Sequence, residues 1–183
     1  VEDLVKRAAE HLGTIGGAVN CVGSIILKPA HLTSDAEWAE TMGQNLNSAF
    51  YFLRASVKVM RKGGGSIVLC SSAAAQIGLA NHEAIAAAKG AVIGLARSAA
   101  ATYAASGIRV NVVAPGLIDT EMAKRITSSE ASLKVSLGMH PIGRIGKPED
   151  VASAIAWFLD PAQGFVTGQV LGIEGGLASL KNH

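Results

Sequence analysis

The sequence predicts an α/β fold in which a parallel sheet is covered by helices on both faces. Short apolar segments alternate with long helical segments along the chain, which is the pattern of successive strand–helix–strand units. Caps and glycine or proline stops mark where the helical segments begin and end. No repeat, low-complexity tract or linker divides the chain, so we expect residues 1–183 to form a single domain with one buried core.

The first half of the chain predicts two helices and two strands. They are a helix at 2–12, a strand at 15–23, a long helix at 35–62 and a strand at 66–72. The first helix stops near Gly13. The long helix starts at a capping box, because Ser34 is followed three residues later by Glu37, and it ends at the glycine run 63–65.

The second half continues the same alternation. It predicts a helix at 82–106, a strand at 108–115, a polar, helix-prone insert at 117–140, a helix at 148–161 and a strand at 168–176. Gly107 terminates the first of these helices. The last helix has Pro148 and Glu149 in its first turn and Pro161 after its end.

The composition excludes several classes of protein. The net charge is +2 and the charges are scattered, so nothing indicates nucleic acid or a membrane surface as a partner. Cys21 and Cys70 each lie in an apolar, strand-like segment, which is typical of buried free thiols, and they lack metal-ligand spacing. We therefore expect a cytoplasmic protein without a metal, a signal peptide or a transmembrane helix.

Three loops follow the ends of successive strands. They are NCVG at 20–23, SSAAAQ at 71–76 and APGLIDTEM at 114–122. In open parallel sheets, ligands bind beyond the carboxyl ends of the strands. The sequence therefore predicts that these three loops meet at one ligand-binding rim.

Together these elements resemble the classical short-chain dehydrogenase/reductase family over essentially the whole chain. The matching segments are NCVG (20–23), QNLNSAF (44–50), the serines at 71 and 72, Lys89, NVVAPGLIDTEM (111–122) and TGQVLGIEGG (167–176). Each segment is weak evidence by itself, and their order and spacing make the match. The resemblance implies a Rossmann-like doubly wound sheet, of which the later four strands and their helices are present.

The resemblance also implies hydride transfer between NAD or NADP and a carbonyl or alcohol carbon. Ser72 would hydrogen-bond the substrate oxygen, Lys89 would hold the ribose and supply positive charge, and Asn45 would support a water leading to Lys89. The expected cofactor-binding residues are Asn20, Gly23, Lys89, Pro115, Gly116, Ile118 and Thr120. Taken alone, each residue could have an ordinary structural role, as a loop cap, a solvated charge or part of a turn.

The position of the family's proton-donating tyrosine, four residues before Lys89, holds Ile85. Isoleucine cannot transfer a proton, and a general acid is typically worth about 10²–10⁴ in rate. Tyr103 lies about 21 Å further along the same predicted helix. Tyr51 lies on another helix and is not excluded by the sequence.

His82 is the candidate substitute acid, because it lies three residues before Ile85 on roughly the same helix face and imidazole titrates near neutral pH. Glu83 is displaced around the helix and ranks lower. The alternative is structural: His82 and Glu83 open the helix, with Asn81 as its cap.

No glycine-rich phosphate-binding motif occurs in the sequence. By resemblance the first three strands are absent, so the strand at 15–22 would become an unpaired edge. The chain begins at Val1, already in a helix, which favours a piece of a longer protein over a naturally short one that pairs this edge with another copy.

Two functions remain open. The first is an NAD(P)-dependent oxidoreductase, impaired as presented, whose 183-residue chain binds no cofactor with normal affinity. The second is a non-catalytic binding or assembly subunit with the same fold. In both cases we expect a homodimer or homotetramer, formed through the helices at 35–62 and 82–106, and the sequence names neither the substrate nor the choice between NAD and NADP.

Overall fold

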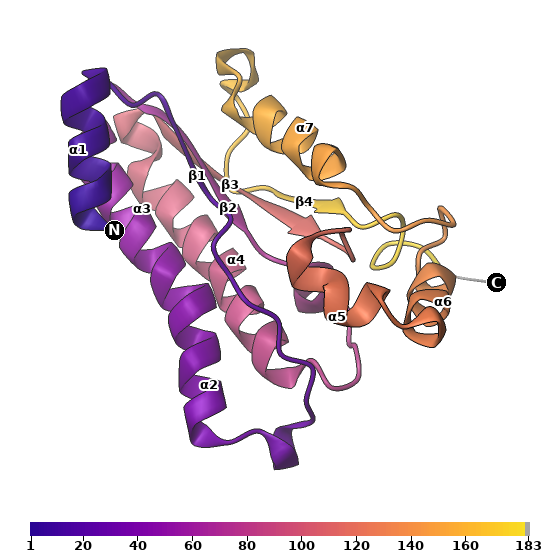
Figure 1. Ribbon diagram of the computed structural model, residues 1–183. Helices are drawn as coiled ribbons and strands as arrows, with labels where there is room; N and C mark the ends of the chain where they lie inside the picture. The colour runs from indigo at the N-terminus through magenta and orange to yellow at the C-terminus, as the bar shows by residue number, and fades with distance from the viewer. Residues whose placement is uncertain (182–183) are drawn as a thin grey trace.

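A parallel sheet of four strands forms the centre of the molecule. The computed structural model describes residues 1–181, except for the side chain of residue 125. The strands are β1 (Gly17–Asn20), β2 (Gly65–Cys70), β3 (Ile108–Pro115) and β4 (Val170–Ile173), and they lie side by side in chain order (Figure 1). All three neighbouring pairs are parallel. The predicted fold class, a partial doubly wound sheet, is confirmed.

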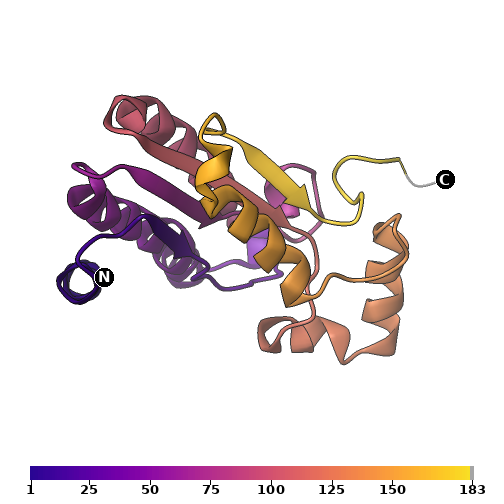
Figure 2. The same cartoon turned by 90° about the horizontal axis from the view of Figure 1, so that it is seen from above.

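Helices cover both faces of the sheet (Figures 1 and 2). The helices are α1 (Glu2–Leu12), α2 (Asp35–Met42), α3 (Ser48–Met60), α4 (Glu83–Tyr103), α5 (Lys124–Thr127), α6 (Glu130–Met139) and α7 (Pro148–Leu159). On one face, α3 and α4 bury a core that includes Leu53, Val92 and Ile67. On the other face, α7 packs Phe158 against Val68. The segment with α5 and α6 lies at the carboxyl ends of the strands.

The predicted helix signals are confirmed at two starts. At α2 the Ser34 hydroxyl accepts from the Glu37 backbone N–H at 3.3 Å, and the Glu37 carboxylate accepts from the Ser34 N–H at 2.8 Å, which completes the capping box. At α7, Pro148 is the first helical residue, where its missing N–H costs no hydrogen bond.

The sequence predicts an uninterrupted helix at 35–62, and this prediction is wrong in the middle of the segment. A π-helical segment, Gly43–Asn47, separates α2 from α3. Such a segment adds a residue to a helical turn and is frequent at functional sites. Here it contains Asn45, a polar side chain that is only 1% exposed.

The start of α4 also differs from the expectation that Asn81 caps it. Asn81 has a φ of 63°, in the left-handed region, and the residue in the cap position is His82, which makes no capping hydrogen bond with its side chain. Asparagine is one of the few residues with a side chain that tolerates this conformation. Asn81 therefore turns the chain into the helix, and Glu83 supplies the negative charge of the first turn.

Two further expectations need correction. The stretch Glu83–Ser106, which contains α4, is long and apolar enough to cross a membrane by length and composition alone. In the fold its apolar side packs on the sheet through Ala88, Val92 and Ala96. Cys21 is exposed rather than buried, because it lies just beyond the end of β1.

The strand β1 lies at an edge of the sheet, as the sequence predicts. Among the described residues it pairs with β2 alone, from Gly17 opposite Ser66 to Asn20 opposite Leu69. The last strand is shorter than the predicted 168–176, because the chain turns away after Ile173.

Candidate active site

The carboxyl ends of the strands open on two neighbouring cavities. The first, which we call the lysine cavity, has a volume of about 170 Å³ and is lined by residues from three strand-end loops and from α4. Among the predicted site residues it gathers Gly23, Ser72, Lys89, Pro115, Gly116, Ile118 and Thr120. The structure therefore brings together seven residues that are scattered over a hundred positions of the sequence.

Lys89 is a buried cation at the back of the lysine cavity. Its ammonium group donates to the backbone oxygen of Cys70 at 3.0 Å. The residue as a whole is 7% exposed. Burial lowers the pKa of Lys89 below its ordinary value, and the nearby Cys70 and Cys21 thiols oppose that shift. One charged donor group is thus fixed against the end of β2 beside an open cavity.

Gly23 allows the loop after β1 to approach this cation. A β-carbon at position 23 would lie 3.0 Å from the Lys89 Nζ and 2.7 Å from the Asn45 Oδ1. No side chain fits in that space. The absence of a side chain at Gly23 is therefore what permits the asparagine, the lysine and the loop to meet.

Asn45 lies behind this loop and holds it in place. Its side-chain nitrogen donates to the Thr41 oxygen at 2.9 Å and to the Ser24 hydroxyl at 3.0 Å, and its side-chain oxygen accepts from the Ser24 N–H at 3.1 Å. The π-helical segment turns the Asn45 amide toward the loop, while the neighbouring helix residues remain packed in the core. Asn45 is therefore satisfied by the protein and supports the wall of the cavity.

The two serines after β2 have different contacts. The Ser71 hydroxyl donates to the Lys89 backbone oxygen at 2.8 Å and so ties α4 to the end of β2. The Ser72 hydroxyl accepts from the Ala74 N–H at 3.2 Å, the loop-cap contact that an ordinary structural interpretation predicts. Ser72 also lines both cavities, which the cap contact does not explain.

The second cavity, which we call the histidine cavity, also measures about 170 Å³ and is more apolar. The two cavities adjoin, because they share lining residues. The shared residues include Ser72, Ile85, Gly116 and Leu117. Ile85 is 5% exposed and stands one helical turn before Lys89. The side chain at the position of the expected tyrosine therefore does reach the boundary between the two cavities.

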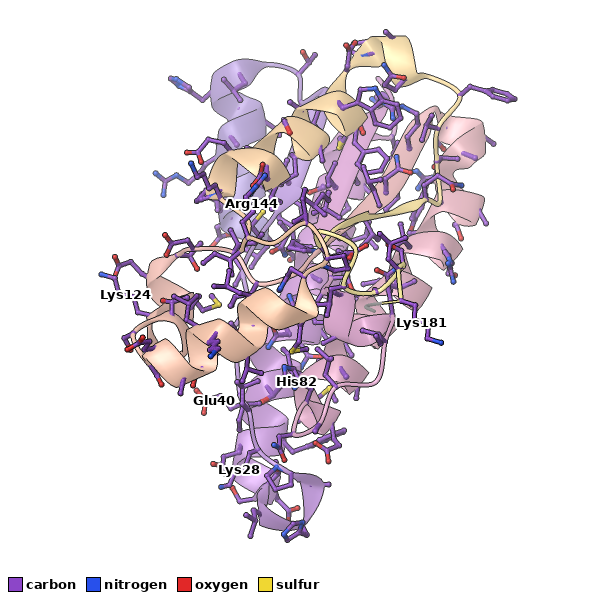
Figure 3. All side chains as sticks on the ribbon, turned by 90° about the vertical axis from the view of Figure 1, so that its right-hand side faces the viewer. Lys28, Glu40, His82, Lys124, Arg144 and Lys181 are labelled. Atoms are coloured by element: carbon purple, nitrogen blue, oxygen red, sulfur yellow. The ribbon has the colours of Figure 1, made fainter. Side chains whose placement is uncertain are left out.

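Two histidines line the histidine cavity. His82 is half-buried, with Nδ1 2.8 Å from the Ala80 oxygen, and Figure 3 shows it at the end of the molecule that carries α5 and α6. His140 is buried, and its Nε2 accepts from the Leu117 N–H at 3.3 Å. That acceptor role leaves the proton on Nδ1, which donates to the Ser136 oxygen at 2.6 Å.

His140 is a residue that the sequence analysis did not single out. A β-carbon at Gly116 would lie 2.7 Å from its Nε2, so the glycine after β3 makes room for this histidine. A lone histidine before Pro141 carries no motif, and only the fold shows that it reaches the cavity.

Other predicted residues lie apart from the cavities. The Asn20 side chain turns back to accept from the Val22 N–H at 2.8 Å. Tyr51 is 43% exposed on α3, where it contacts Phe50 and Arg54, and Tyr103 packs against the core at the end of α4. Neither tyrosine lines the lysine or the histidine cavity. Within residues 1–181 no group of three or more metal-ligating side chains occurs.

Comparison with known proteins identifies the family. A family model described as enoyl-(acyl carrier protein) reductase matches residues 1–178. A curated relative from Xanthobacter autotrophicus, inactive 2-(S)-hydroxypropyl-CoM dehydrogenase 2, is 35% identical over 178 residues, which cover 94% of this chain and 77% of the relative.

Solved structures agree with this assignment. A short-chain type dehydrogenase/reductase from Mycobacterium ulcerans superposes with a TM-score of 0.92 at 34% identity, over 97% of this chain and 65% of its own. ElxO with NADP bound superposes with a TM-score of 0.91 at 31% identity, over 98% of this chain and 73% of its own. The fold, the matched length and these relatives place the chain in the classical short-chain dehydrogenase/reductase family.

Proposed function

We propose that this chain carries the nicotinamide end and the substrate end of an NAD(P)-dependent oxidoreductase site that acts on a carbonyl or alcohol group. One observation supports the proposal above all. A buried lysine, a strand-end serine and the loop 115–120 line a single cavity, although each is an ordinary residue by itself. The adjoining histidine cavity supplies an apolar space for the body of a substrate.

The lysine cavity fits one end of a nicotinamide dinucleotide. A cavity of about 170 Å³ is smaller than the sites that enclose a whole drug-sized ligand, so only one end of the cofactor would lie in it. Lys89 has ammonium protons beyond the one held by Cys70, and these suit ribose hydroxyls. The sequence has no glycine-rich turn for the pyrophosphate, so we expect the 183-residue chain to bind NAD(P)H more weakly than micromolar.

The bound cofactor would supply or accept the hydride. Of the chain's own residues, Ser72 would donate a hydrogen bond to the substrate oxygen as negative charge develops there. Lys89 would orient the ribose and lower the pKa of a neighbouring acid by its charge. Asn45 would act as a positioning residue, because it fixes the loop that contains Gly23 against Lys89.

The proton has no ordinary donor at position 85. We propose His82 as the substitute, because it lines the same cavity as Ser72 and Ile85. Its Nδ1 is engaged with the Ala80 oxygen, which leaves Nε2 as the nitrogen that would serve the substrate. His140 is a poorer candidate because backbone groups occupy both of its nitrogens.

The test combines cofactor binding with turnover. NADH and NADPH are titrated by their fluorescence into the 183-residue chain and into the protein expressed from the whole gene. Lys89→Met is the test variant, and Lys62→Met, an exposed lysine, is the matched control. Binding by the whole-gene protein that weakens in Lys89→Met alone supports the proposal, and unchanged binding in that variant contradicts it.

A second function has its own support. Ile85 stands at the boundary where a proton donor is needed, and one relative carries the word inactive in its name. We therefore keep a non-catalytic assembly subunit as the alternative. Binding of NAD(P)H without turnover across a panel of ketones, aldehydes and secondary alcohols favours this alternative, and turnover that His82→Ala abolishes favours the enzyme.

We also propose that the protein forms a homodimer or homotetramer through its long helices. Phe50 and Tyr51 pack edge to face on the outer side of α3, with Arg54 over both rings, and Trp38 on α2 is 46% exposed. Exposed aromatic groups of this kind are typical of protein interfaces. Light scattering at high concentration tests the proposal, and a strict monomer contradicts it.

A further inference from the structure

The two cysteines of the chain face each other across neighbouring strands. Asn20 is paired with Leu69, so the next residues, Cys21 and Cys70, lie opposite each other where β1 and β2 end. Neighbouring strands run about 4.7–4.9 Å apart. A disulfide requires Cα atoms about 4.4–6.8 Å apart, so this register satisfies its first geometric condition.

The side chains of the two cysteines lie on the same face of the sheet. Val19 and Val68, two residues before each cysteine, both belong to the core under α7, and Cys70 packs against that core as well. Side chains alternate between the faces of a strand with a period of two. Cys21 and Cys70 therefore both point toward the α7 side, and both line the lysine cavity.

The surroundings favour a reactive thiolate on Cys21. It is exposed, whereas Cys70 is half-buried. The neighbouring Cys70 thiol lowers the pKa of Cys21 to about 7, and the positive charge of Lys89 acts in the same direction against the effect of burial. The Cys21 thiol and burial raise the pKa of Cys70. One member of the pair is poised to attack and the other to remain protonated.

We propose that Cys21 and Cys70 form a thiol-modification site, which closes to an intramolecular disulfide when the protein meets a hydroperoxide. The Cys21 thiolate attacks one oxygen of hydrogen peroxide and releases hydroxide, which leaves a sulfenic acid on Cys21. The Cys70 sulfur then attacks the Cys21 sulfur, the S–S bond forms as the S–O bond of the sulfenic acid breaks, and the leaving hydroxyl takes the Cys70 thiol proton and departs as water. The two thiols lose two electrons and two protons, and the peroxide is reduced to two waters.

The bond would form at the wall of the lysine cavity. The oxygen that holds the Lys89 ammonium group belongs to Cys70, and a β-carbon at Gly23, two residues after Cys21, would lie 3.0 Å from the same ammonium. Closing the disulfide ties these two loops together and removes the Cys21 thiol from the cavity opening. This thiol chemistry does not depend on the proposed oxidoreductase function.

The experiment treats the reduced 183-residue chain with one equivalent of hydrogen peroxide. We expect the intact mass to fall by two hydrogens, both free thiols to disappear, and non-reducing peptide mapping to join the peptides of Cys21 and Cys70. A reducing agent should restore both thiols. A disulfide-linked dimer, or a product oxidised at Cys21 with Cys70 still free, overturns the proposal.

Single variants separate the two roles. In Cys70→Ser, peroxide should leave a Cys21 sulfenic acid that a 1,3-dicarbonyl reagent traps, and the wild-type chain should give far less of this adduct. In Cys21→Ser the half-buried Cys70 should react slowly with iodoacetamide. Equal trapping in the wild-type chain and in Cys70→Ser overturns the proposal.

The pH dependence of alkylation gives a second measurement. Iodoacetamide should react with Cys21 of the wild-type chain with a midpoint near pH 7, and Cys70→Ala should move this midpoint upward because the neighbouring thiol is lost. A midpoint that stays the same in Cys70→Ala contradicts the assigned pairing. Circular dichroism confirms beforehand that each variant is folded.

Discussion

The two ends of the candidate site are built on different principles. Around Lys89 the polar groups are held by hydrogen bonds: the ammonium donates to the Cys70 oxygen, and the Asn45 amide makes three hydrogen bonds to Thr41 and Ser24. Around Ile85 the walls are mainly apolar, and the polar side chains are those of Ser72, Ser136 and the two histidines. The first end thus contains a buried cation, Lys89, whereas among the described residues no lysine, arginine, aspartate or glutamate lines the second.

This difference separates binding from proton transfer. Burial of a cation costs folding free energy, and this cost is the argument for the binding role proposed for the cluster around Lys89. Under the proposed function, the buried isoleucine at position 85 removes a proton donor and leaves the cluster around Lys89 intact. The proposed function therefore assigns binding to the cluster around Lys89 and makes proton transfer the step that needs another donor.

Among the variants that test this difference, we expect Ile85→Tyr to have the largest effect, on the rate of carbonyl reduction. The new hydroxyl would stand one turn from Lys89, whose charge lowers the pKa of a neighbouring phenol. We expect carbonyl reduction by the protein expressed from the whole gene to rise by about 10²–10⁴. Ile85→Phe is the matched control, since it adds the ring without the hydroxyl, and equal rates in the two variants would show that the hydroxyl is not the cause.

The next effect is expected at the other end of the site, from Lys89→Met. Hydrogen bonds to charged groups contribute about 1.5–3 kcal/mol, so the dissociation constant for NAD(P)H should rise about tenfold to a hundredfold. Because burial lowers the pKa of Lys89, its charged form is less favourable in the fold than in water, and the midpoint of thermal unfolding should not fall. A large loss of stability with unchanged affinity would make Lys89 a structural residue.

Asn45→Ala tests whether the cavity wall depends on the π-helical segment. The Ser24 N–H loses its acceptor and the Thr41 oxygen loses a donor, so we expect the free energy of unfolding to fall by about 1–3 kcal/mol in urea titration. Asn47→Ala, an exposed asparagine in the same segment, should change it by less than about 0.5 kcal/mol. Equal losses in the two variants would contradict the role given to Asn45.

The smallest effect concerns Glu37, outside both cavities. The Lys28 ammonium, followed by the Ser34 N–H and hydroxyl, lowers the pKa of Glu37 to about 2 from an ordinary 4.5. A lowered folded-state pKa stabilises the fold above pH 4.5, and this contribution disappears as the pH falls toward 2. The difference in thermal midpoint between wild type and Glu37→Gln should therefore be small at pH 6 and vanish by about pH 2. A difference that grows on acidification would reverse the assigned sign.

The sequence predicted the elements better than the exact contacts. Alternating strands and helices, the capping box at Ser34 and the stop at Gly107 follow from local rules and are confirmed. The π-helical segment could not be predicted, because nothing in GQNLN distinguishes it from an α-helical run; the inward turn of Asn45 is a property of tertiary packing. The left-handed conformation of Asn81 could not be told from a cap in the sequence for a similar reason, since asparagine suits both positions.

The candidate site shows the same division. Motif order placed Gly23, Ser72 and Lys89 near one another, and the cavity gathers them. His140 and the facing cysteines were missed because their neighbours come from strand register and from a helix distant in sequence. Strand register brings together residues that are about fifty positions apart, and no local sequence pattern indicates that pairing.

The π-helical segment has a consequence for insertions and deletions. One extra residue in a helix turns everything beyond it by about 100°. Removing Leu46 would convert Asp35–Met60 into one regular α-helix, and then either Asn45 would leave the cavity wall or the apolar side of α3 would leave the sheet. The number of residues in this helix is therefore constrained by the fold. A single-codon deletion between 43 and 47 should destabilise the protein more than most substitutions at the same positions.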